Sequence, residues 1–128
     1  MLAQHQAMID KFSAAYAELT AEKIAHFPDL YADDVVFMDP VQQIYSVQDL
    51  QVYFFRIIEQ TYYHRVKVIR AFSSDNDVFI LWELSYAHAN LEQGDDISVE
   101  GASHVRLEGE RIIFQRNYYD MGAMLYEH

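Results

Sequence analysis

The spacing of apolar residues changes once along this 128-residue chain, and that change limits the folds open to it. Before about residue 62, apolar side chains recur at intervals of three and four residues, as on one face of a helix. After that point, apolar and polar residues alternate in long stretches, which is typical of β-strands. Helices followed by a run of strands indicate an α+β domain.

The first half predicts two helices and a short strand. Residues 2–19 form an amphipathic helix. Thr20 caps a shorter helix, which is interrupted at Pro28, and residues 31–34 close this helical hairpin. Residues 35–38 are β-branched and aromatic, and they predict a brief strand that stops before Pro40.

A further helix and a meander of strands complete the expected order. Ser46 and Asp49 have the spacing of a capping box, and the helix that they start should run to about Tyr62. Turn-forming Gly, Asn and Asp residues then separate four strands, so neighbouring strands should pair antiparallel. No linker or repeat divides residues 1–128, which are expected to form one domain. The four strands span 64–72, 78–89, 97–107 and 111–120.

The second of these strands is apolar on both of its faces. Val78, Trp82 and Tyr86 share one face, and Phe79 and Leu81 share the other. An antiparallel sheet usually leaves one face in water, so a second apolar face needs a cover. The helices cover one face, and a second subunit is expected to cover the other. The sequence therefore predicts a homodimer through the sheet face.

Composition excludes several classes of function. Twenty acidic residues against nine basic ones give a net charge of −11, which argues against binding nucleic acid or an anionic membrane surface. No apolar stretch reaches the roughly 18 to 20 residues of a membrane span. The chain has no cysteine, so disulfides and cysteine zinc sites are excluded. The N-terminal residues lack the features of a signal peptide, and a cytoplasmic location is expected.

Three segments carry a resemblance to a known superfamily. They are Tyr-Ala-Asp-Asp-Val-Val-Phe-Met-Asp-Pro-Val at 31–41, Glu-Gly-Ala-Ser-His-Val-Arg at 100–106, and Arg-Asn-Tyr-Tyr-Asp-Met-Gly-Ala-Met-Leu-Tyr at 116–126. With these three segments in this order, the chain resembles the nuclear transport factor 2-like superfamily. This superfamily includes ketosteroid isomerases and SnoaL-like polyketide cyclases. The resemblance implies a cone-shaped, curved antiparallel sheet packed on N-terminal helices, with an apolar pocket open at one end.

Asp39 is the candidate catalytic residue, because the resemblance places it where ketosteroid isomerases have their proton-shuttling base. A carboxylate beside an apolar cavity can take a proton from carbon next to a carbonyl. The alternative is that Asp39 only forms the turn before Pro40. Phe12 and Ser103 stand where the isomerases have a tyrosine and a neutral aspartic acid that stabilise the enolate, so steroid isomerisation is not expected. Tyr16 lies one helical turn from Phe12, out of register with that tyrosine.

The resemblance also assigns candidate ligand-binding residues. Its alignment turns Gln115, Asn117 and Tyr119 toward the pocket and Ile112 and Asp120 away from it. Buried amides need partners, so these polar groups either orient a ligand or form a network with buried water. Asp120 instead suits the cap of a short helix at 121–126. The full set of candidate ligand-binding residues is Tyr16, Trp82, Leu84, Tyr86, Ser103, Gln115, Asn117 and Tyr119.

No metal or cofactor is expected. The six histidines show no metal-binding spacing, and His5, His26, His64 and His128 are expected at the surface. The expected partner is a small, mostly apolar ligand. Three hypotheses follow: a cofactor-independent isomerase or cyclase in which Asp39 moves a proton on an apolar carbonyl-bearing or polycyclic substrate, a non-catalytic binder of a hydrophobic metabolite, or a dimeric protein-interaction scaffold.

Overall fold

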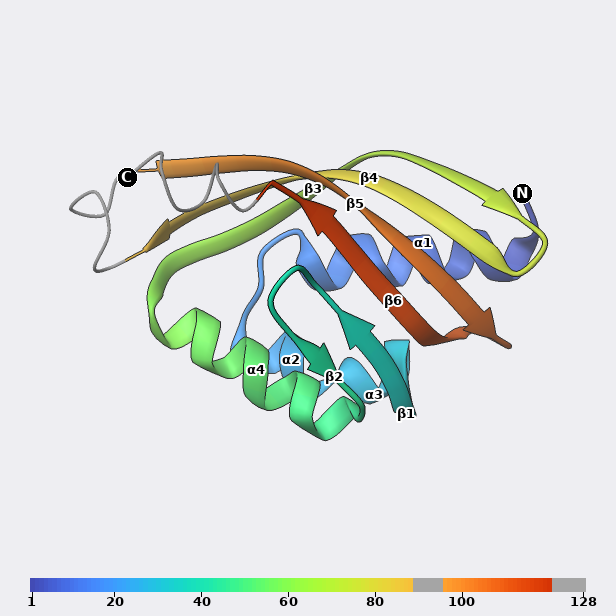
Figure 1. Ribbon diagram of the computed structural model, residues 1–128, viewed down its shortest axis with the longest axis horizontal. Helices are drawn as coiled ribbons and strands as arrows, with labels where there is room; N and C mark the ends of the chain where they lie inside the picture. Colours follow the sequence, from blue (N-terminus) through green and yellow to red (C-terminus); the bar gives the residue numbers. More distant parts are fainter. Residues whose placement is uncertain (89–95, 121–128) are drawn as a thin grey trace.

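The computed structural model describes residues 1–88 and 96–120, apart from the side chain of His88. The fold is α+β, with helices packed against a curved sheet of six strands (Figure 1). Parts of three predictions lie outside the described residues: the turn at 92–96, the end of the strand at 89, and the helix at 121–126.

Four helices form the layer on one side of the sheet: α1 (Ala3–Tyr16), α2 (Ala21–Ala25), α3 (Phe27–Leu30) and α4 (Val47–Glu59). Thr20 caps α2, as predicted, because its hydroxyl accepts a hydrogen bond from the Lys23 N–H at 3.2 Å. Ser46 caps α4 in the same way through the Asp49 N–H at 3.1 Å. Pro28 sits in the first turn of α3, where no N–H is required, and so separates α3 from α2.

The sheet has the strand order β2-β1-β6-β5-β4-β3. Strands β3 to β6 form the predicted antiparallel meander, but β1 runs parallel to β6, so the sheet is mixed. The strands are β1 (Tyr31–Met38), β2 (Gln43–Ile44), β3 (Thr61–Ser74), β4 (Asp77–His88), β5 (Asp96–Glu108) and β6 (Arg111–Tyr119).

Several boundaries differ from the prediction; helix α1, for example, ends at Tyr16 rather than at residue 19. Residues 31–34 do not close a helical hairpin but begin strand β1, because Tyr31 pairs with Ile112 of β6 across the sheet. Helix α4 ends at Glu59 rather than near Tyr62, and β3 begins two residues later. The Thr61 hydroxyl donates to the Ile57 carbonyl at 3.1 Å, which satisfies an orphan acceptor at the end of the helix.

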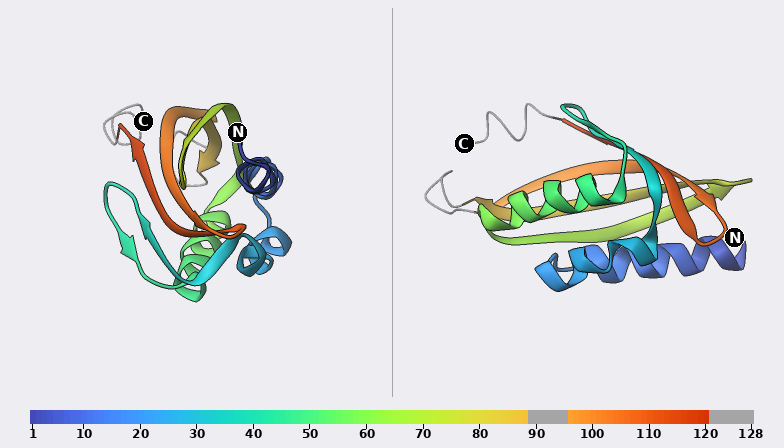
Figure 2. Two further views of the ribbon diagram at one scale, coloured as in Figure 1. Left: turned by 90° about the vertical axis from the view of Figure 1, so that its right-hand side faces the viewer. Right: turned by 90° about the horizontal axis from the view of Figure 1, so that it is seen from below.

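Bulges curve the sheet and change which residues face inward. Leu107 pairs with Ile112 while Arg106 pairs with Phe114, so Ile113 is an extra residue in β6. Ile112 was expected to point outward, but the bulge reverses the alternation before it and Ile112 is fully buried. A second bulge in β3 falls between Val68 and Arg70. Figures 1 and 2 show the long strands bending over the helices as a half-open cone.

Rings around Phe54 hold α4 against the rest of the core. Its centroid lies 5.6 Å from those of Tyr16 and Phe27 and 5.9 Å from that of Phe37, mostly in edge-to-face arrangements. Such contacts add to the free energy gained by burying the rings. They fix α4 as one wall of the cone, opposite the inner face of β4.

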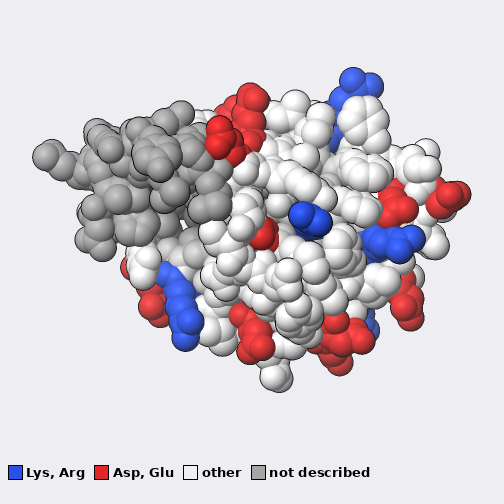
Figure 3. Space-filling view, in the orientation of Figure 1, with Lys and Arg blue, Asp and Glu red and all other residues white. Residues whose placement is uncertain are grey.

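No helix in the described part of the chain has the length and apolar character needed to cross a membrane. On the face seen in Figure 3, the Lys and Arg side chains are separated from one another by uncharged and acidic groups.

Candidate functional site

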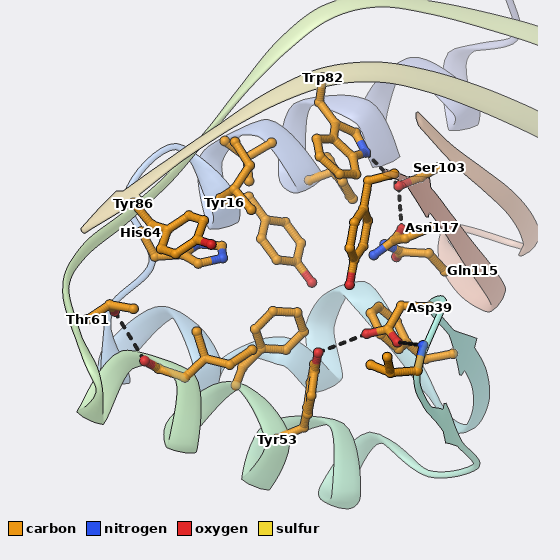
Figure 4. Close-up of a pocket in the computed structure, with 18 of the residues that line it drawn as sticks. Tyr16, Asp39, Tyr53, Thr61, His64, Trp82, Tyr86, Ser103, Gln115 and Asn117 are labelled. Carbon is orange, nitrogen blue, oxygen red and sulfur yellow. Dashed lines mark hydrogen bonds between the residues drawn. The ribbon is translucent and has the colours of Figure 1, made fainter. Parts of the chain in front are cut away.

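A cavity of about 360 Å³ opens between α1, α4 and the inner face of the sheet (Figure 4). Aromatic and aliphatic side chains make up most of its lining. The structure brings all nine candidate site residues together around it: Tyr16, Asp39, Trp82, Leu84, Tyr86, Ser103, Gln115, Asn117 and Tyr119.

Asp39 both forms the turn and faces the cavity. Its Oδ1 accepts hydrogen bonds from the backbone N–H groups of Val41 and Gln42, at 2.9 and 2.8 Å. Its Oδ2 accepts a 2.8 Å bond from the hydroxyl of Tyr53 on α4. The two roles considered for Asp39, turn residue and general base, are therefore compatible. The turn uses Oδ1, and Oδ2 lies on the cavity side. The turn and Tyr53 together hold the carboxylate in one orientation.

A hydrogen-bonded chain runs through the polar residues of β5 and β6. The Trp82 indole N–H, which can only donate, bonds Ser103 Oγ at 2.8 Å, and Ser103 donates to Asn117 Oδ1 at 2.5 Å. Gln115 Nε2 donates to the same Asn117 oxygen at 3.0 Å. Asn117 Nδ2 has no partner among the described residues, and Figure 4 shows the amide beside the cavity. Asn117 therefore offers a hydrogen-bond donor to a ligand.

The chain continues from Gln115 to two buried tyrosines. Tyr31 donates its single hydroxyl proton to Gln115 Oε1 at 2.7 Å. The 2.6 Å bond between the Tyr16 and Tyr31 hydroxyls must therefore be donated by Tyr16. Burial raises the pKa of both hydroxyls well above the ordinary 10.0, so both stay protonated. The oxygen of Tyr16 thus faces the cavity as an acceptor.

Two more tyrosines flank Asp39. Burial, and then the nearby Asp39 carboxylate, raise the pKa of Tyr53 above its ordinary value and that of Tyr119 to about 12. Both hydroxyls are therefore donors at neutral pH. The Tyr119 hydroxyl makes no hydrogen bond to the described part of the chain, and its ring packs against Trp82 at 6.3 Å between centroids.

His64 lines the cavity, although the sequence predicted a surface position. Only 7% of it is exposed, and burial lowers the pKa of its imidazole from 6.5 to about 4. The alternation of β3 could have identified it, because His64, Val66 and Val68 share one parity. His5 is also buried rather than exposed, and its spacing from Met8, Ile9 and Phe12 is that of one helical face.

His26 and His104 do not line the cavity. His26 is exposed, as predicted, and lies 3.4 Å from Asp29. His104 faces away from the cavity and bonds Asp77 at 2.8 Å. His128 lies outside the described residues. Within residues 1–88 and 96–120 the side chains form no group of three or more His, Asp or Glu that could hold a metal ion. Asp120 is exposed and is not part of the lining.

Comparisons with known proteins agree with this fold. A comparison with curated proteins gives no match. A Catenulispora acidiphila protein, described as having a ketosteroid isomerase-like fold and solved with trimethylamine, is 16% identical with a TM-score of 0.81; the match covers 93% of this chain and 89% of that one. A structure named as a SnoaL-like polyketide cyclase from Shewanella putrefaciens is 14% identical with a TM-score of 0.79, covering 97% and 95%.

A third structure, an LEH-like epoxide hydrolase of M. tuberculosis, is 15% identical with a TM-score of 0.77, covering 96% of this chain and 87% of that one. At these identities the likeness extends to the fold alone. The family model for the SnoaL-like domain matches residues 12–115, which include α4, β1 to β5 and most of β6. The chain therefore belongs to the SnoaL-like domain family, within the nuclear transport factor 2-like superfamily.

Proposed function

We propose that this protein binds a small, mostly apolar ketone in the cavity and that Asp39 removes a proton from the carbon beside the carbonyl. The observation that carries this proposal is the position of Asp39, the one acidic side chain among the described lining residues. Its carboxylate is oriented before the ligand arrives, which is what a general base requires.

Two donors support the developing negative charge on the carbonyl oxygen. Asn117 Nδ2 and the Tyr119 hydroxyl have no hydrogen-bond partner in the described part of the chain, and both belong to the lining. Neutral donors aimed at an enolate oxygen stabilise the transition state, and losing one such donor typically costs about 10²- to 10³-fold in rate. The proton that leaves carbon goes to Asp39, and its return to another carbon would complete an isomerisation.

A non-catalytic binder is the second candidate, and the hydrogen-bonded chain favours it. Trp82, Ser103 and Tyr16 all use their only side-chain proton within the protein. These groups therefore hold the side chains of the cavity wall in place and have no proton left to donate to a reacting oxygen. A protein whose donors are mostly satisfied internally needs no reaction to explain its polar residues.

The test measures proton removal directly and does not require the natural substrate to be known. The bicyclic ketone 2-tetralone is incubated with the protein in D₂O, and replacement of its α-hydrogens by deuterium is followed by proton NMR. Asp39→Asn should slow protein-dependent exchange by about 10²-fold or more. The Asn oxygen can still accept from the Val41 and Gln42 N–H groups, so the turn should survive the substitution.

Asp33→Asn is the matched control, because Asp33 is an exposed acid on the same strand that leads to Asp39. It should leave the exchange rate unchanged. Equal exchange by the native protein and Asp39→Asn would refute the role of Asp39 as base. Saturable binding of 2-tetralone without protein-dependent exchange would instead favour the non-catalytic binder.

A further inference from the structure

We propose that the end of the cavity opposite Asp39 is a second subsite, in which His64 hydrogen-bonds a hydroxyl group of the ligand. This inference rests on the proposed function and narrows the ligand class. The ligand would be a flat, apolar molecule with a carbonyl at one end and a hydroxyl at the other.

The first observation is that His64 is buried and that its Nδ1 lacks a partner in the described part of the chain. That nitrogen is itself enclosed. Buried polar groups are paired in the great majority of cases, and an unpaired one is destabilising. The imidazole therefore has hydrogen-bonding capacity that the described residues leave unused.

The second observation is where the ring points. His64 belongs to the cavity lining, and Figure 4 shows a ring nitrogen on the cavity side, across the cavity from Asp39. Phe54 packs edge-to-face against the imidazole at 6.3 Å between centroids and limits its rotation. The ring is therefore held in place to meet a ligand atom.

Neighbouring polar groups at this end are already used or exposed. The Thr61 hydroxyl donates to the Ile57 carbonyl at 3.1 Å, so its proton is not available to a ligand. Gln60 lines the same end of the cavity but is exposed to solvent. His64 is thus the buried group at this end that lacks a partner among the residues described.

The chemistry of the imidazole selects a hydroxyl. A neutral imidazole has one N–H donor and one acceptor nitrogen, and a hydroxyl can both donate and accept, so it pairs with either tautomer. Burial keeps the imidazole uncharged at neutral pH by lowering its pKa to about 4. An uncharged ring gives a carboxylate no compensating charge for leaving water, so an acidic group is disfavoured here.

The experiment compares two ligands that differ by one hydroxyl. Binding of 6-hydroxy-2-acetonaphthone and of 2-acetonaphthone is measured by quenching of Trp82, the only tryptophan in the chain and part of the lining. The native protein should bind the hydroxylated ketone about 10-fold more tightly. His64→Phe should abolish this preference and leave the affinity for 2-acetonaphthone within about 2-fold.

His26→Phe is the matched control, since it makes the same change at an exposed histidine, and it should retain the preference. Nitrogen-15 NMR of the native protein supplies a readout that does not depend on a folded variant. The ring nitrogens of His64 should shift with the hydroxylated ketone and much less with the other.

Equal weakening of both ketones by His64→Phe, or equal nitrogen shifts with both, would overturn the inference and leave the proposed function standing. If neither ketone binds the native protein at millimolar concentration, the proposed function fails and the second subsite fails with it.

Discussion

The indole of Trp82 lies directly over Gly101, its cross-strand partner in β5. A Cβ built at Gly101 would fall 2.3 Å from Cη2 and 2.7 Å from Cζ2 and Cζ3 of that ring. Non-bonded carbon atoms do not approach so closely, so only glycine lets the indole lie flat here. The absence of this one side chain places Trp82 where its N–H reaches Ser103.

Gly101→Ala should therefore displace Trp82 into the cavity and break its bond to Ser103. Overpacking of this kind typically destabilises a fold by about 1–3 kcal/mol, measured here by chemical denaturation. The emission of Trp82 should change as well. Ala102→Ser, at the neighbouring outward position, is the control. An unchanged stability and emission spectrum for Gly101→Ala would show that the indole has another position available.

Tyr31→Phe should cost more stability than Tyr16→Phe. The first change leaves two buried polar groups unpaired, Gln115 Oε1 and the Tyr16 hydroxyl proton. The second removes a donor from Tyr31 but leaves the bond from Tyr31 to Gln115 intact. We expect about 2–3 kcal/mol for Tyr31→Phe and about 1 kcal/mol for Tyr16→Phe in urea denaturation. The reverse order would mean that the proton direction assigned to this chain is wrong.

His64 should make the protein less stable as the pH falls from about 6.5 to about 4. The unfolded chain protonates this histidine near 6.5, whereas the folded protein resists protonation until about 4. The unfolded state therefore binds more protons within this window, and the free energy of unfolding falls as acid is added, by up to about 3 kcal/mol. Above the window the contribution is constant.

Denaturation of the native protein and of His64→Phe at several pH values would measure the contribution of His64 to the free energy of unfolding. The variant should lose less stability between about pH 6.5 and 4 than the native protein. Asp77 affects the pH dependence of stability in a different pH range. The His104 hydrogen bond lowers the pKa of its carboxyl below the ordinary 3.8, so this group is protonated only at lower pH. Parallel curves for the two proteins would contradict the assignment to His64.

We propose that a second copy of the chain covers the outer face of the sheet. Phe72 lies opposite Phe79 there, and Leu81 lies opposite Ala102, which in turn faces Tyr118. The exposed fraction of the Phe72, Phe79, Leu81 and Tyr118 side chains is 38–49%. Leu81→Glu should convert a dimer to a monomer in light scattering, whereas Val52→Glu, at an exposed valine on α4, should not. A native protein that is monomeric at high concentration would refute this proposal.

The starts of α2 and α4 and the inward face of β4 follow from local signals in the chain. Thr20 and Ser46 each lie at the end of an extended segment. The hydroxyl of each accepts a hydrogen bond from the backbone N–H three residues later, in the first turn of a helix. The alternation of β4 likewise identifies Val78, Ile80 and Trp82 as one face, because side chains in a strand point to opposite sides in turn. Such information lies within a few neighbouring residues, so the sequence alone was sufficient.

Other features depend on contacts that no local pattern records. Tyr31 became a strand residue because β6, some eighty residues later, offers it a parallel partner. The bulge at Ile113 reversed the orientation of Ile112, since one unpaired residue shifts the alternation of everything before it. Tertiary structure also decided that Asp39 meets Tyr53 and that His64 is buried, with its Nδ1 unpaired within residues 1–88 and 96–120. Burial and pairing depend on which distant elements pack around a side chain.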